Sequence, residues 1–78
     1  MELKEFIENF KEVFDDEELT GIDGDAFFKE LGGWGSLTAL SLIAMVDENY
    51  DVSITGNEIR KADTIEDLFA LVQSKKNV

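Results

Sequence analysis

Apolar residues at the beginning of the chain recur with the period of an α-helix. They stand three, four and seven positions apart, at Leu3, Phe6, Ile7, Phe10, Val13 and Phe14. Because mostly charged residues fill the positions between them, these side chains form one stripe of an amphipathic helix whose opposite side faces water. We expect this helix to end near residues 15–18, because several acids at a helix C-terminus oppose the helix dipole.

Three more helices are expected in the second half of the chain. An apolar run predicts one from Ser36 to Tyr50. The segment Thr55-Gly56-Asn57-Glu58 has the form of a capping box, which starts a short helix that we expect to end near Ala62. A weaker signal of the same kind at residues 64–67 starts the last helix, whose apolar face consists of Ile65, Leu68, Phe69 and Val72.

Signals for β-structure are weak in this sequence. The chain has no proline, and its best candidate strand, Val52-Ser53-Ile54, is too short. The predicted fold is therefore all-α, a four-helix bundle with three longer helices and one short helix. The 78 residues are enough for a single domain, 1–78, with one modest core.

Residues 17–35 form a long connection between the first two helices. Glycines interrupt it at Gly21, Gly24, Gly32 and Gly33. Its apolar side chains, Leu19, Ile22, Phe27, Phe28 and Leu31, give it enough apolar surface to pack against the bundle. Loops of this length are uncommon in compact domains, so we expect a short helical turn around residues 25–31. Asp23-Gly24-Asp25 resembles the start of a calcium loop, but the downstream ligands are missing, which favours a simple turn.

The chain contains no cysteine and no histidine. A disulfide, a thiolate metal site, the usual zinc sites and the Ser-His or Cys-His nucleophile arrangements are therefore all excluded. We predict no catalytic residue and no metal site, and we expect that the chain is not an enzyme.

The formal net charge is −11, from 18 acidic and 7 basic residues. Such a surface repels nucleic acids and favours partners with basic patches, although the charge also serves to keep a small domain soluble. No segment has the pattern of a signal peptide or the run of about 20 apolar residues that spans a bilayer. We expect a cytoplasmic monomer that binds neither nucleic acid nor membrane.

The predicted helix at residues 36–50 is apolar on two sides. One face serves the core, with Ala39, Leu42, Ile43, Val46 and Tyr50. The other side places Leu37, Leu40, Ala44 and Met45 beside Asp47 and Glu48, and we predict that it contacts partner proteins. The alternative is that this helix is central in the bundle and that the long connection covers its second side.

Ser36 stands in the segment GGWGSLTAL, directly before the apolar run of that helix. Taken alone, this position favours an N-cap residue. A phosphate ester on the same hydroxyl also suits a helix N-terminus, whose free N–H groups and dipole favour an anion.

Here the sequence resembles the acyl carrier proteins and the related peptidyl carrier domains. Their signature is an aspartate-serine-leucine motif at the start of the second helix, after a glycine and often an aromatic or aliphatic residue. The matching residues are Gly33-Trp34-Gly35-Ser36-Leu37. The order and spacing of the weaker motifs extend the resemblance over nearly the whole chain, so it implies a bundle of acyl-carrier type with a long loop between the first and second helices.

The resemblance implies a carrier function. Ser36 would carry 4′-phosphopantetheine, attached from coenzyme A by a separate phosphopantetheinyl transferase, and its thiol would hold acyl groups as thioesters for fatty-acid or related lipid synthesis. The space between the helices would shelter the acyl chain. The residues that would bind the transferase and acyl-processing enzymes with basic docking patches are Leu37, Leu40, Met45, Asp47 and Glu48.

The sequence departs from the family where Gly35 replaces the usual aspartate before the serine. The fold tolerates this change, since glycine in place of a capping aspartate costs only a few tenths of a kcal/mol. The change removes a carboxylate that in the family pairs with the transferase. Gly35 therefore leaves three alternatives: a matched transferase that tolerates it, a carrier that is poorly modified, or a chain that is itself a variant. Two other functions also stay open: an aminoacyl or peptidyl carrier, and an unmodified interaction domain with the carrier fold.

Overall fold

A computed structural model of the chain describes residues 2–14 and 22–76. Four α-helices and one 3-10 helix follow each other in the order α1 (Leu3–Lys11), η1 (Phe28–Glu30), α2 (Ser36–Tyr50), α3 (Gly56–Lys61) and α4 (Ile65–Lys76). Within those two ranges there is no strand, and the one isolated β-bridge pairs Phe27 with Thr64. The predicted all-α bundle with three longer helices and one short helix is confirmed.

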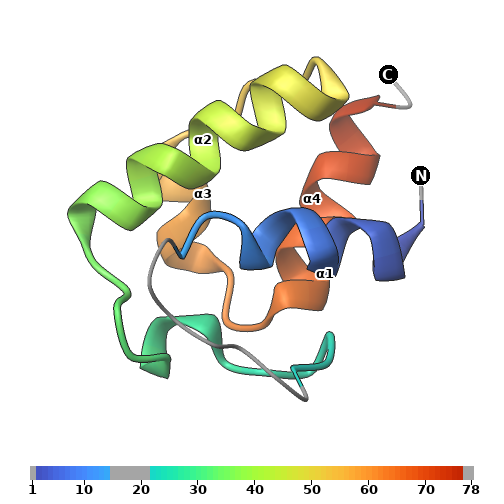
Figure 1. Cartoon of the computed structure of the whole chain (residues 1–78). Coiled ribbons are helices and arrows are strands. Elements are labelled where there is room, and N and C mark those ends of the chain that lie inside the picture. The colour runs from blue at the N-terminus through green and yellow to red at the C-terminus, as the bar shows by residue number, and fades with distance from the viewer. Residues whose placement is uncertain (1, 15–21, 77–78) are drawn as a thin grey trace.

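Helix α2 packs against all three other α-helices, α1, α3 and α4, and α1 also packs against α4. In Figure 1, α2 runs along one side of the molecule, with α1 in front of α4 below it and α3 behind. The 3-10 helix η1 lies at the far end of the long connection and confirms the helical turn expected at residues 25–31.

The amphipathic first helix forms as expected but is shorter than predicted. It ends at Lys11, so the end expected near residues 15–18 is wrong, and residues 15–18 themselves lie outside the described ranges. The N–H of Val13 bonds to the carbonyl of Phe10, and the N–H of Phe14 bonds to that of Lys11. These tighter turns replace the α-helical pattern and return Phe14 to the core, where it is 5% exposed.

Aromatic side chains fasten the long connection to α1. The ring of Phe28 is fully buried and lies 6.1 Å from Phe10 and 4.9 Å from Trp34, both edge to face. Such pairs add to the stabilisation from burial alone. They hold the residues just before α2 in place, and so they set where α2 begins.

The start of α4 is capped by its own side chains and by the connection. Thr64 Oγ1 accepts from the N–H of Asp67, whose carboxylate accepts from the N–H groups of Asp63 and Thr64, so the weaker capping signal is confirmed. These backbone bonds lower the pKa of the Asp67 carboxyl. The carbonyl of Gly24 accepts the N–H of Glu66 at 2.8 Å, and a Cβ on Gly24 would lie 2.5 Å from Glu66 Cγ. A side chain at this position would therefore have to displace the side chain of Glu66.

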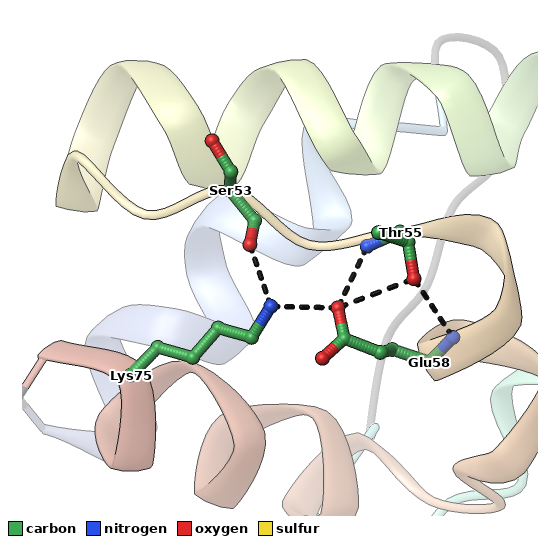
Figure 2. A network of polar contacts seen from close by, with 4 residues as sticks. All are labelled: Ser53, Thr55, Glu58 and Lys75. Carbon is green, nitrogen blue, oxygen red and sulfur yellow. Dashed lines mark hydrogen bonds and ion pairs between the residues drawn. The ribbon is translucent and has the colours of Figure 1, made fainter.

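A polar network fixes α3 to the end of α4 (Figure 2). The predicted capping box is present, since Thr55 Oγ1 accepts from the N–H of Glu58 and Glu58 Oε1 accepts from the N–H of Thr55. Lys75 Nζ lies 2.7 Å from the same Glu58 oxygen and 2.7 Å from the carbonyl oxygen of Ser53. One carboxylate thus both caps α3 and pairs with α4, and α3 ends at Lys61 as expected.

Candidate functional site

Ser36 is the first residue of α2 and is exposed. The N-cap is Gly35, and no side chain caps this helix, so the expectation that Ser36 is the capping residue is wrong. Among the hydrogen bonds of the described residues none involves Ser36 Oγ, whereas the Thr38 hydroxyl donates to the carbonyl of Gly33 at 2.7 Å. The Ser36 hydroxyl is therefore free to react or to be modified.

Ser36 lies on the edge of an apolar pocket between α2 and α3. Its volume is about 680 Å³. Helix α2 contributes one stripe, Ser36, Ala39, Leu40 and Ile43, and α3 contributes the facing stripe, Gly56, Ile59 and Arg60. Trp34 and Gly35 close the end of the pocket next to the serine, and Lys29 reaches it from η1. A volume of this size, with mostly apolar walls, is typical of small-molecule sites.

The described residues that line the pocket include two cations, Lys29 and Arg60, and no acid. Lys29 Nζ donates to the carbonyl of Arg60, and the Arg60 guanidinium donates to the side chain of Asn57. Within residues 2–14 and 22–76, carboxylates pair only with Lys11 and Lys75. No carboxylate of these two ranges therefore pairs with Lys29 or Arg60, although the chain has a net charge of −11.

The exposed side of α2 differs from the expected one at Met45. Leu37 is 80% exposed and Leu40 is 62% exposed, as predicted. Met45 is only 8% exposed, so its placement among the exposed residues is wrong. The reason is that α1 packs beside it: Asn9 of α1 and Val13, two residues after the end of α1, line the same groove as Met45. The covering of the second side thus comes from α1 and reaches Met45 but not Leu37 or Leu40.

The two acids near the end of α2 are exposed. Asp47 and Glu48 face solvent, as do Ser41 and Ala44 between them and the two leucines. One side of α2 therefore carries exposed apolar residues near Ser36 and carboxylates further along. We call Leu37, Leu40, Asp47 and Glu48 the α2 surface.

Gly35 has room for a side chain. Its φ is −173°, an extended conformation open to every residue, and a Cβ built on it would meet no atom within 4 Å. The glycine is therefore not required by the fold. The Cβ of an aspartate at this position would fit without any movement of its neighbours.

The sequence did not point to the walls of the pocket. Lys29, Trp34, Ile59 and Arg60 were not predicted as site residues, although the i, i+3, i+4 spacing of Gly56, Ile59 and Arg60 marks one face of α3. This spacing does not indicate which helix packs opposite α3, because that depends on the tertiary structure.

Comparison of the chain with protein-family models, with curated proteins and with solved structures gives no match. In the described part of the chain, no helix has the length and apolarity needed to cross a membrane.

Proposed function

We propose that the chain is an acyl carrier protein that holds acyl groups as thioesters on a 4′-phosphopantetheine arm at Ser36, for fatty-acid or related lipid synthesis. The observation that carries the proposal is the position of Ser36. It is exposed, its hydroxyl makes no hydrogen bond with the described residues, and it is the first residue of a helix and lines an apolar pocket. The acyl-carrier type of the bundle is part of the same proposal.

The residues around Ser36 fit such an arm. The uncapped N–H groups at the start of α2 favour a phosphodiester on Ser36 Oγ, and the pocket between α2 and α3 suits an apolar acyl chain. The arm would supply the thiol that this cysteine-free chain lacks. Ile43 and Ile59 would contact the acyl chain and keep water from it.

The attachment would be made by another enzyme, because the chain has no histidine to act as the usual base toward the Ser36 hydroxyl. In the transfer, Ser36 Oγ forms a bond to the phosphorus that bears pantetheine in coenzyme A. The pyrophosphate bond breaks, adenosine 3′,5′-bisphosphate leaves, and the hydroxyl proton passes to a base on the transferase. The α2 surface would bind the transferase and the acyl-processing enzymes, with its leucines in apolar contact and its acids against basic patches.

The test is the intact mass of the chain after incubation with coenzyme A, magnesium and a broad-specificity phosphopantetheinyl transferase. We expect the mass of one phosphopantetheine on the native chain and none on Ser36→Ala. Modification of Gly35→Asp alone would identify a poorly modified carrier. No addition to either the native chain or Gly35→Asp would contradict the carrier function and favour an unmodified interaction domain, for which the exposed Leu37 and Leu40 already argue.

The α2 surface is tested separately by the double substitution Asp47→Lys, Glu48→Lys. Both residues are exposed, so we expect unchanged helicity by circular dichroism. The rate of modification by the transferase should fall at least several-fold at low salt, since attraction becomes repulsion. Exposed Asp63→Lys, Asp25→Lys on other elements is the matched control, which should retain the native rate. An equal loss of modification rate in the control would show that the rate depends on the total charge of the chain and not on the α2 surface.

A further inference from the structure

We propose that the pocket beside Ser36 is built for an acyl chain that carries a carboxylate at its far end, an ω-carboxyacyl group. This inference rests on the proposed carrier function and names the class of acyl group. The walls of the pocket are mostly apolar, and its lining also includes the cations Lys29 and Arg60. A ligand that matches both features has an apolar body and an anionic end.

The apolar walls of the pocket favour a ligand with an apolar body. Ile59 is 2% exposed, while Ala39 and Ile43 are half-buried, so the inner surface offers no group that would hydrogen-bond a polar chain. A group whose carboxylate lies next to the thioester has no methylenes to cover this surface. A chain of several methylenes covers the apolar surface of the pocket, and removing this surface from water is favourable.

The rim requires an anion. Arg60 is exposed and Lys29 is half-buried, so both cations stand where the pocket meets solvent. Their present partners are neutral: a main-chain carbonyl and the amide of Asn57. Among residues 2–14 and 22–76, no acid lines this pocket. A carboxylate can accept hydrogen bonds from a guanidinium and an ammonium together, which a terminal methyl cannot.

A titration of the unmodified chain tests the pocket without the arm. The probes are monomethyl adipate, which keeps one carboxylate, and dimethyl adipate, which has none. We expect the carboxylate probe to shift the methyl resonances of Ile43 and Ile59 at concentrations about two- to fivefold lower, in line with exposed ion pairs. Equal concentrations for the two probes, or no shift with either, would overturn the proposal.

Charge-removing variants locate the effect. Lys29→Gln and Arg60→Gln should each reduce the preference for the carboxylate probe, and about 0.5 M salt should reduce it as well. Lys61→Gln is the matched control, because it removes the same charge from the same helix outside this pocket. An equal loss of preference in Lys61→Gln would mean that only overall charge acts, which would overturn the assignment.

The loaded carrier gives the second measurement. Adipoyl and hexanoyl groups, matched in carbon number, are placed on Ser36 from their coenzyme A thioesters, and cleavage by hydroxylamine is followed by intact mass. We expect adipoyl to be cleaved about two- to fivefold more slowly, and Arg60→Gln to remove this difference while hexanoyl keeps its rate. If Arg60→Gln instead lowers the urea midpoint of the arm-bearing chain before any acyl group is added, the cations serve the phosphodiester and the proposal is wrong. Failure to load either group contradicts the carrier function. The titration still tests, independently of loading, whether the pocket prefers a ligand with a carboxylate.

Discussion

Gly35 stands directly before Ser36, and the lack of a side chain there affects both the cap of α2 and the surroundings of the serine. It is the N-cap of α2, yet it has no side chain to bond the free N–H groups of the first turn. Its extended backbone and the open space around it admit an aspartate. The fold therefore does not require glycine at this position, and the carboxylate is missing only because of the sequence.

We expect Gly35→Asp to raise the free energy of unfolding by a few tenths to about 1 kcal/mol, because the new carboxylate caps α2 and meets its positive dipole end. Urea unfolding at neutral pH measures this change. Gly35→Ala is the control, since alanine has no capping group and should bring no such gain. Equal stability of the alanine and aspartate variants would show that the start of α2 is not limited by its cap.

At the scale of the element, α2 has three kinds of surface. Leu42 and Val46 are fully buried, Ala39 and Ile43 line the pocket, and Leu37 and Leu40 are exposed. The periodicity of the sequence predicted a helix with two apolar sides. It did not indicate how far α1 covers the second side, because that depends on the packing of residues more than 30 positions away.

Two truncations separate the buried from the exposed residues of α2. Met45→Ala should lower the free energy of unfolding by about 2 kcal/mol or more, because it leaves a cavity against α1. Leu37→Ala should change it by no more than about 0.5 kcal/mol, because its side chain is in water. Urea unfolding of both variants measures the difference, and a large loss in Leu37→Ala would contradict the assignment of this residue to the α2 surface.

The network at α3 gives the molecule a dependence on acid pH. Hydrogen bonds from Lys75 and from the N–H of Thr55 lower the pKa of the Glu58 carboxyl. A carboxyl whose pKa is lower in the folded state stabilises the fold above its unfolded pKa of about 4.3, and this stabilisation is lost as the pH falls through the folded value.

We expect Glu58→Gln to lower the free energy of unfolding by about 1 kcal/mol at pH 7, because the glutamine amide replaces a charged acceptor that caps α3 and pairs with Lys75. The difference from the native chain should shrink as the pH falls below about 4. Thermal unfolding from pH 7 to pH 3 measures it. A difference that stays constant over this range would mean that the ionised carboxylate does not stabilise α3.

At the scale of the whole molecule, charge opposes folding. A net charge of −11 is confined to a body of 33 × 23 × 21 Å. At low ionic strength the acids repel each other across the whole molecule, because the screening length of about 30 Å at 0.01 M salt exceeds most of its dimensions.

We therefore expect the urea midpoint to rise when NaCl is increased from about 0.01 M to about 1 M, where the screening length falls to about 3 Å. The variant Asp47→Asn, Glu48→Gln removes two exposed negative charges and should gain less from salt than the native chain. A midpoint that falls with salt would show that attractive ion pairs, such as Lys75 with Glu58, outweigh the repulsion.

Local sequence was enough to predict the four helices and the caps of α3 and α4, because these depend on residues within three or four positions of each other. The stripe of α1, the box at Thr55 and Glu58 and the cap at Thr64 and Asp67 are of this kind. Only the tertiary structure decided that α1 covers Met45, and that Lys29 and Arg60 stand at the pocket beside Ser36. These contacts join residues far apart in the chain, and no local spacing records which faces will meet.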